Sequence, residues 1–174
     1  ISTLFPAVKA IAEGHVSKIF YLTAKTIVRD VAEESLAKMK DNGLRLKAVI
    51  LTAKDKICFK EKSICNAESC EFAKGHFDRI NDALLDMLQH ENNFNRKTIE
   101  TYSIKHKVCP FEFSLDLTIF ADCIICDYNY VFDPRVYLRR LFSDTSGDYA
   151  FLIDEAHNLV DRARDMFSAE LSKN

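Results

Sequence analysis

Two adjacent carboxylates near the end of the chain, Asp154 and Glu155, are the residues best suited to chemistry. They directly follow Tyr149–Ile153, a short apolar run that is typical of a buried strand. Open parallel sheets bind ligands at the carboxyl ends of their strands. There, one carboxylate can help to hold the Mg²⁺ of a bound nucleotide, and its neighbour can orient and deprotonate the attacking water. The pair alone leaves two readings open: a nucleotide-hydrolysing site, and an acidic pair that caps the next helix and favours its dipole, which the bare pair favours.

The phosphate-binding element that such a site requires is absent from the 174 residues. A P-loop reads Gly-x-x-x-x-Gly-Lys followed by Ser or Thr, and its backbone N–H groups hold the phosphates. None of the four glycines precedes Lys-Ser or Lys-Thr; they are Gly14, Gly43, Gly75 and Gly147. We therefore expect that this chain alone does not hydrolyse ATP.

Four of the six cysteines form a second group of candidate ligands: Cys58, Cys65, Cys70 and Cys109. Four thiolates can bind either zinc or an iron–sulfur cluster. Structural zinc sites usually contain close ligand pairs, and only Cys65 and Cys70, with four residues between them, approach that spacing. The spacing therefore favours a cluster over zinc. Polar neighbours such as Lys60, Asn66 and Glu71 argue against simple burial in a core.

The remaining two cysteines, Cys123 and Cys126, form a C-x-x-C within a strand-like apolar run. Positions three apart on a strand point to opposite faces, so the two thiols cannot easily hold one metal ion. Since nothing indicates secretion, disulfides are not expected either. We interpret both as buried apolar residues.

A basic stretch runs from Lys47 to Arg79 and contains seven Lys or Arg residues, several of them near phenylalanines. Acidic residues lie among them, so a solvated surface of mixed charge and a track for nucleic acid are both compatible with this stretch. The net charge of the chain, −2, does not by itself indicate nucleic-acid binding.

The elements that must position these residues read as α/β at both ends of the chain. Short apolar runs at 18–23, 46–51, 123–126 and 149–153 predict strands, and residues 26–42 predict a helix that ends at Gly43. Continuous apolar strands separated by helices predict a parallel sheet covered on both faces.

The middle of the chain, residues 54–109, has no strand-like run and reads as a helical insertion. Residues 77–88 predict one amphipathic helix with Phe77 on its apolar side, and residues 98–106 predict another. Beyond the insertion, Asp133-Pro134 resembles an N-cap followed by proline at the first helical position, which predicts a helix towards Phe142.

The composition places the chain among globular proteins, because 48% of its residues are hydrophobic. No apolar run reaches eighteen residues, so we expect no membrane span, and the first residues do not resemble a signal peptide. The absence of an initiator Met predicts a fragment of a longer protein.

Four short motifs occur in order along the chain. They are Phe20-Tyr21-Leu22-Thr23-Ala24-Lys25-Thr26, Cys109-Pro110-Phe111, the Y-x-Y-x-x-D-P string that begins at Tyr128, and Asp154-Glu155-Ala156-His157. In this order they resemble motif Ia, the last cluster cysteine, a signature string and motif II of the XPD/DinG family of iron–sulfur helicases in superfamily 2. The bacterial DinG-like members look most similar.

The resemblance implies a role for each matching residue. Asp154 would coordinate Mg²⁺, Glu155 would activate water, and His157 would couple the nucleotide state to a second motor domain. Thr23, Lys25 and Thr26 would contact DNA phosphates, unless Lys25 and Thr26 merely begin a surface helix or Thr23 or Thr26 caps it. The four cysteines, Cys58, Cys65, Cys70 and Cys109, would hold a [4Fe-4S] cluster. Lys54 would face DNA or the cluster, and Tyr128 would either stack on bases or pack beneath the sheet.

The resemblance also implies a partial RecA-like motor domain 1, formed by residues 1–53 and 110–174, with an iron–sulfur insertion at 54–109. The expected activity is that of an ATP-dependent 5′-to-3′ DNA helicase with a role in DNA repair. Its expected partners are ATP, single-stranded and forked DNA, and the arch and second motor domains of its own polypeptide. The P-loop is expected immediately before Ile1, and the expected location is a bacterial cytoplasm, at the nucleoid. Two alternatives are a four-cysteine zinc module that binds nucleic acid without ATP chemistry and an electron carrier; motif Ia and D-E-A-H argue against the carrier.

Overall fold

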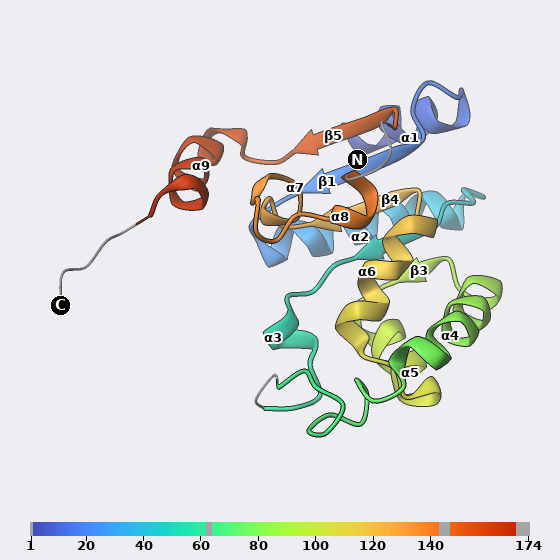
Figure 1. Cartoon of the computed structure of the whole chain (residues 1–174). Coiled ribbons are helices and arrows are strands. Elements are labelled where there is room, and N and C mark those ends of the chain that lie inside the picture. Colours follow the sequence, from blue (N-terminus) through green and yellow to red (C-terminus); the bar gives the residue numbers. More distant parts are fainter. Residues whose placement is uncertain (1, 62–63, 143–146, 170–174) are drawn as a thin grey trace.

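A parallel β-sheet forms the centre of the molecule in the computed structural model, which describes residues 2–61, 64–142 and 147–169. Within these ranges the sheet has five strands in the order β3-β2-β4-β1-β5 (Figure 1). The strands are β1 Lys18–Leu22, β2 Ala48–Ile50, β3 Asn93–Phe94, β4 Cys123–Cys126 and β5 Tyr149–Ile153. The predicted α/β class and parallel sheet are therefore confirmed.

The register of the sheet aligns the carboxyl ends of its three neighbouring strands β4, β1 and β5. Leu22, the last residue of β1, pairs with Cys126 of β4 and with Ile153 of β5. The residues that follow these strands are Thr23, Asp127 and Asp154. Three polar side chains thus leave the sheet at one edge, where ligands of α/β proteins bind.

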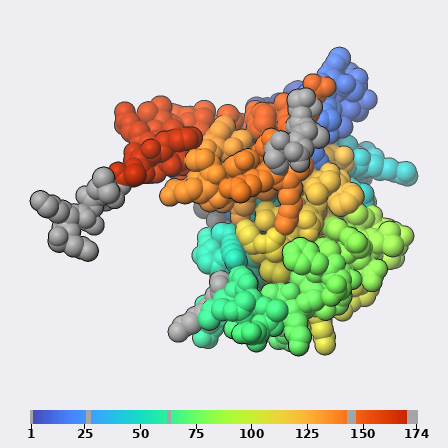
Figure 2. All heavy atoms as spheres, in the orientation of Figure 1, coloured from blue at the N-terminus to red at the C-terminus, as the bar shows by residue number. Residues whose placement is uncertain are grey.

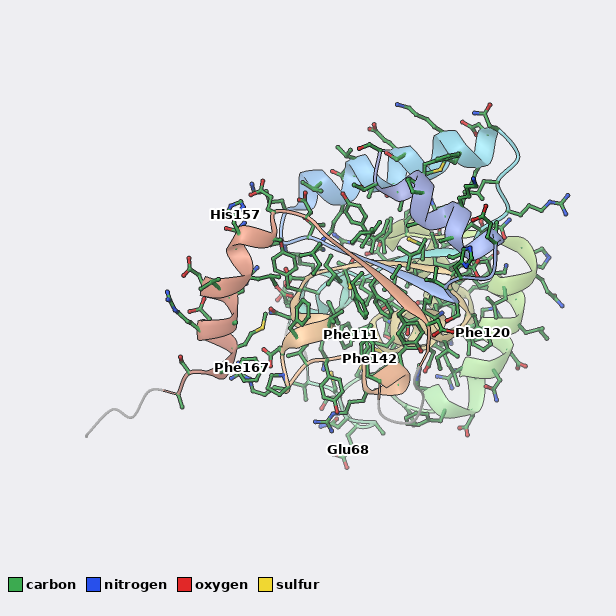
Figure 3. The ribbon with its side chains drawn as sticks, turned by 90° about the horizontal axis from the view of Figure 1, so that it is seen from above. Glu68, Phe111, Phe120, Phe142, His157 and Phe167 are labelled. Carbon is green, nitrogen blue, oxygen red and sulfur yellow. The ribbon has the colours of Figure 1, made fainter. Side chains whose placement is uncertain are left out.

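One face of the sheet is covered by α1 Leu4–Ala12 and α2 Thr26–Asp41, which lie together on one side of the strands in Figure 3. Leu4, Val8 and Leu36 from these helices pack with Ile19 and Ile125 of the sheet. As predicted, α2 ends just before Gly43, which has a φ of 94° and so adopts a conformation that favours glycine.

The other face is covered by helices of the insertion and of the segment that follows it. These helices are α4 His76–His90, α5 Arg96–His106, α6 Pro110–Phe120, α7 Asn129–Phe132 and α8 Arg139–Phe142. Met87, Ile99 and Leu117 belong to the same buried cluster as Phe20 and Ile124 of the sheet. The predicted insertion therefore shares one hydrophobic core with the sheet.

Three short elements complete the described chain. They are α3 Lys54–Ile57, which opens the insertion, the 3₁₀ helix η1 Ala156–Asn158 and α9 Leu159–Phe167. The helix α9 lies at one side of the molecule, beyond the end of β5 (Figure 1). No helix among the described residues is long and apolar enough to cross a membrane.

Two expectations for the middle of the chain are wrong. Asn93–Phe94 forms β3, although we predicted no strand between residues 54 and 109; a two-residue strand gives no periodic signal, and its pairing with Ala48 and Val49 creates it. Phe77 was assigned to the apolar side of its helix, yet it is 83% exposed, while Ile80, Ala83 and Met87 form the buried side.

The helix predicted from Asp133 to Phe142 is also wrong over most of its length. Asp133 follows α7, and its carboxylate accepts a hydrogen bond from the backbone N–H of Arg135 at 2.8 Å. The chain then turns, and the N–H of Leu138 donates to the carbonyl of Tyr130. Asp133 therefore stabilises a turn instead of capping a helix, and only Arg139–Phe142 is helical.

Candidate nucleotide site and cysteine cavity

Asp154 lies at the aligned carboxyl ends of β1 and β5. Its backbone N–H donates to the carbonyl of Leu22 at 2.9 Å, which extends the strand pairing by one residue. The hydroxyl of Thr23 is 3.4 Å from Asp154 Oδ2 and donates to it. Thr23 is 1% exposed, so this hydroxyl positions a carboxylate that itself is only partly buried.

Glu155 forms an ion pair across the same edge. Lys25 Nζ is 2.7 Å from Glu155 Oε1, and Asn158 Nδ2 donates to Oε2 at 3.3 Å. The hydrogen bond from Lys25 and its charge hold the pKa of Glu155 below its ordinary value, so the group is a carboxylate at neutral pH. Glu155 also has a φ of 48°, a left-handed conformation that is uncommon outside glycine and often marks functional sites.

Tyr128 contacts the backbone of the acidic pair from the core of the protein. Its hydroxyl donates to the backbone carbonyl of Asp154. Burial, together with the charges of Asp154 and Glu155, raises the pKa of this phenol, so it stays protonated and able to donate. The residue is 1% exposed and belongs to the core. Tyr128 therefore has no ring face available for a base, which corrects its assignment to DNA stacking in favour of packing.

The other motif residues are more exposed. His157 Nε2 is 3.6 Å from Glu155 Oε2, and its ring lies at the outside of the molecule where the chain leaves β5 (Figure 3). The side chain of Lys25 is 59% exposed despite its ion pair. Thr26 is the first residue of α2, and its side chain lies outside the described part. Lys25 occupies the N-cap position without a side-chain cap, so neither Thr23 nor Thr26 is the N-cap residue.

Asp127, which follows β4, is a member of this edge that our sequence analysis missed. Arg29 Nη2 of α2 is 3.8 Å and Arg162 Nη2 of α9 is 3.5 Å from its Oδ2. Arg29 also donates to the carbonyl of Leu51, just past β2. Asp127 thus joins two helices that flank the acidic pair. The signal that identified Asp154, a carboxylate directly after an apolar strand, was present here as well.

The four candidate ligand cysteines line one cavity of about 330 Å³ at the outer end of the insertion. Cys58 ends α3, Cys65 and Cys70 lie in the loop that follows, and Cys109 is the N-cap of α6 with Pro110 at the first helical position. Residues 58–61 and 64–75 occupy the end of the molecule opposite α1, drawn in teal and green in Figure 2. Cys123 and Cys126 are instead fully buried on opposite faces of the sheet, as predicted.

Polar groups surround these thiols. A hydrogen bond with Cys65 raises the pKa of Lys54, whose Nζ is also 5.8 Å from the ring centroid of Phe111. Burial raises the pKa of the Cys109 thiol, and the backbone N–H groups of Glu112 and Phe111 offset part of that rise. Lys54 therefore lines the cysteine cavity.

His76 is a further polar member of the cavity lining that our sequence analysis missed. The ring is 4% exposed, its Nδ1 accepts the backbone N–H of Cys109 at 3.2 Å, and its Nε2 has no hydrogen-bond partner. Burial lowers the pKa of this histidine. Only its position six residues after Cys70 hinted at a place near the cysteines.

The four thiols that line the cavity have the chemistry that an iron–sulfur cluster requires. Among the residues described, no three His, Cys, Asp or Glu side chains gather around one ion-sized point. A zinc ion needs four ligands at about 2.0–2.3 Å, whereas these cysteines are distributed around a cavity of about 330 Å³. A cavity lined by four thiols with an unpartnered buried nitrogen is compatible with an iron–sulfur cluster.

Comparison with known proteins identifies the family. The model of the family described as DEAD_2 matches residues 39–174, which include the cysteine cavity and the acidic pair. The chain belongs to the DEAD_2 family. The resemblance to an XPD/DinG-like helicase region of superfamily 2 is thereby confirmed.

Several helicase-related relatives are similar to this DEAD_2 chain over part of its length. The XPD subunit of general transcription and DNA repair factor IIH from Dictyostelium discoideum is 27% identical, over 60% of this chain and 13% of its own. The Fanconi anemia group J protein homolog from Gallus gallus is 32% identical over 40% of this chain and 5% of its own. Regulator of telomere elongation helicase 1 from Bos taurus is 22% identical over 94% of this chain and 14% of its own.

The DEAD_2 chain therefore spans only a small part of the length of these relatives. A solved structure titled truncated XPD has the same fold, with a TM-score of 0.62 and 23% identity over 95% of this chain and 47% of that one. This likeness supports the prediction of a partial RecA-like domain.

Proposed function

We propose that this chain is part of the first motor domain of an ATP-dependent DNA helicase, and that Asp154 and Glu155 form its hydrolytic centre. One observation carries the proposal: both carboxylates follow β5 at the end of the sheet where β1 also ends, and Thr23 and Lys25, in the turn between β1 and α2, contact them directly. An acidic pair that only capped the next helix would bond to its N–H groups, yet η1 has no side-chain cap from Glu155.

In this proposal each carboxylate has a distinct role. Asp154, oriented by the Thr23 hydroxyl, would hold the Mg²⁺ that neutralises charge on the nucleotide phosphates. Glu155 is kept ionised beside Lys25 and would accept a proton from the attacking water. The residues that bind the phosphates would lie outside these 174 residues, which contain no P-loop.

The substitution Glu155→Gln in the full-length protein tests the centre. The amide keeps the size of the side chain but cannot accept the proton, so DNA-stimulated ATP turnover should fall at least about 100-fold, the lower range for a general base. Binding of DNA and of ATP should persist. Glu13→Gln, which alters an exposed ion pair with Lys9, serves as the control. Near-normal hydrolysis by the Glu155→Gln protein would remove Glu155 from the mechanism.

We extend the proposal to DNA and to the rest of the polypeptide. Lys25 and Thr26 begin α2 at the same edge, and the exposed ammonium of Lys25 suits a DNA phosphate. His157, exposed beside Glu155, would contact the second motor domain. Residues 1–53 and 110–174 would be the motor part and residues 54–109 the insertion. Unwinding would run 5′ to 3′, as in the family that the motifs resemble.

We also propose that Cys58, Cys65, Cys70 and Cys109 hold a [4Fe-4S] cluster. When bound, it would supply four iron–thiolate bonds that join the loop after α3 to the beginning of α6. Lys54 would contribute positive charge beside it. The insertion so organised would engage single-stranded DNA ahead of the motor, and the basic residues of this region favour that role.

Metal analysis of the anaerobically purified protein tests the cluster. We expect about four iron and four sulfide ions per chain and a brown protein. A colourless protein with one zinc ion would overturn the cluster and favour a four-cysteine zinc module that binds nucleic acid. The Glu155→Gln test measures ATP turnover and the metal analysis measures iron and sulfide. A negative result in one therefore leaves the other proposal standing.

A further inference from the structure

His76 presents a buried donor that the proposed cluster site does not use. It lies at the first position of α4, lines the cysteine cavity, and is 4% exposed. Among the described residues, its Nε2 is one of only a few buried side-chain nitrogens or oxygens without a hydrogen-bond partner. An unsatisfied buried polar group costs about 1–3 kcal/mol, so such an atom calls for an explanation.

The hydrogen bond at the other ring nitrogen fixes the tautomer. The backbone N–H of Cys109 donates to Nδ1 at 3.2 Å, so Nδ1 is an acceptor and carries no proton. In a neutral imidazole the proton then lies on Nε2, which makes this atom a donor. The same interaction ties the ring to Cys109, so the donor is fixed relative to one of the four thiols.

The two carboxylates of α6 nearest to this ring have other partners. Glu112 Oε2 is 2.7 Å from Arg140 Nη2, and Asp116 Oδ1 is 3.0 Å from Arg140 Nη1. His76 Nε2 has no hydrogen-bond partner, so neither of these carboxylates accepts a hydrogen bond from it. The ring also lines the cavity that the four cysteines share, and an acceptor held there would satisfy this donor.

We propose that His76 donates its Nε2–H to a sulfur of the group held by the four cysteines, either a thiolate or a bridging sulfide. The inference rests on the proposed [4Fe-4S] cluster and makes His76 a positioning and tuning residue for it. A donor to sulfur stabilises the reduced, more negative cluster, so His76 raises the reduction potential. The ring simultaneously orients Cys109 through its backbone.

Two substitutions separate the donation from Nε2 to the cluster from the hydrogen bond that Nδ1 accepts from Cys109. His76→Asn keeps an oxygen near the position of Nδ1 that can accept from Cys109, but it lacks any group at the position of Nε2. His76→Gln reaches the position of Nε2 with an amide N–H but loses the acceptor near the backbone. His106→Asn is the control, because His106 contacts Asp86 at 2.6 Å and does not line the cavity.

The readouts are iron and sulfide content and a redox titration of the full-length protein followed by electron paramagnetic resonance. With iron content unchanged, the Asn variant should titrate at a more negative potential than the wild type. The Gln variant should lie between them, and the His106 control should match the wild type. Equal potentials in the wild type and the Asn variant would overturn the role of His76.

If the variants lose the cluster, a measurement on the wild-type protein still tests the proposal. Protein labelled with ¹⁵N at histidine Nε2 should give a weak ¹⁵N coupling in pulsed resonance spectra of the reduced cluster. Absence of that coupling would overturn the proposal while leaving the cluster intact. A wild type without iron would instead refute the proposed cluster itself.

Discussion

Lys25 would have two anionic partners, because its ammonium neutralises Glu155 and is also the cation that we propose for a DNA phosphate. One ammonium cannot fully satisfy both anions. When Lys25 turns to DNA, Glu155 loses the hydrogen bond that lowers its pKa. The carboxylate then becomes a stronger base, which is the property that a water-activating group requires. DNA binding and ATP hydrolysis would be coupled through this one side chain.

The substitution Lys25→Met tests this coupling. The pKa of Glu155 should rise towards its ordinary value, because the hydrogen bond and the charge of Lys25 are its main causes of depression. Titration of the Glu155 carboxyl carbon by nuclear magnetic resonance measures the shift. The control is Lys9→Met, which removes a similarly exposed ammonium that pairs with Glu13. If the Lys25→Met protein titrates like the control, Lys25 does not hold the charge of Glu155.

The sequence predicted the two carboxylates of the site but not the residues that pack around them. A carboxylate after an apolar run is visible in the sequence, so Asp154 and Glu155 were found. The burial of Thr23 and Tyr128 depends on which strands are neighbours, and a single strand pattern does not contain that order. Asp127 followed the same rule as Asp154, but we gave it no role, although it directly precedes the Y-x-Y-x-x-D-P string.

At the scale of elements, α6 connects the cysteine cavity to the sheet. It begins at Pro110, directly after Cys109, and ends beside Lys18, the first residue of β1. Lys18 is 9% exposed, and its Nζ donates to the carbonyls of Thr118 at 3.0 Å, Ile119 at 3.3 Å and Ala121. A cation that binds the last carbonyls of a helix satisfies them and interacts favourably with its dipole.

Replacing Lys18 by Met should therefore destabilise the protein. Buried carbonyls of α6 would lose their donor, at a cost of about 1–3 kcal/mol. The measurement is denaturant unfolding. Lys40→Met is the matched control, because Lys40 Nζ binds a single exposed carbonyl, that of Asn92. A cost no larger than that of the control would mean that Lys18 does not secure the end of α6.

A second junction, between α4 and α5, predicts a dependence on pH. Hydrogen bonds from Lys105 and His106 lower the pKa of Asp86 to about 2. A depressed carboxyl pKa stabilises the folded state above the unfolded value of about 4, and this contribution is lost as the pH falls towards 2. Asp86→Asn should lower stability at pH 6 and flatten the fall between pH 4 and 2. Unfolding curves across this range should show no such change for Asp82→Asn, an exposed residue of the same helix.

The elements themselves were largely predictable where the pattern was long. The helix at 26–42 and the strands at 123–126 and 149–153 were expected within a residue or two. The helix expected from Asp133 failed because Asp-Pro serves turns and helix starts equally well. The carbonyl of Tyr130, which accepts from Leu138, decides between them only in the folded chain.

At the scale of the whole molecule, the insertion consists of helices that pack on the sheet and a loop that carries three of the four candidate ligand cysteines. The helices α4, α5 and α6 share the hydrophobic core of the sheet, whereas none of the residues described between Cys58 and Gly75 belongs to that core. The order of this loop would depend on whatever joins the four cysteines. The cluster would therefore organise the loop without being required for the motor fold.

Cys70→Ser tests this division in the full-length protein. We expect loss of iron and faster hydrogen exchange and proteolysis between residues 58 and 75. Exchange in β1 and β4 should stay slow, because their residues pack in the two cores. Ser69→Ala, an exposed neighbour in the same loop, is the control. Fast exchange throughout the sheet of the Cys70→Ser protein would show that the fold depends on the ligand cysteines.

The helix α6 also limits how the sequence of this region can change. Its eleven residues place Cys109 at one end and the Lys18 contact at the other. Each residue of an α-helix turns the chain by about 100°, so inserting or deleting one residue would rotate Cys109 away from its three partners. The loop between Cys58 and Cys70 carries no such restriction, since the side chains described there lie outside the core that α6 shares with the sheet. Natural variants should therefore differ in the length of that loop while α6 keeps its length.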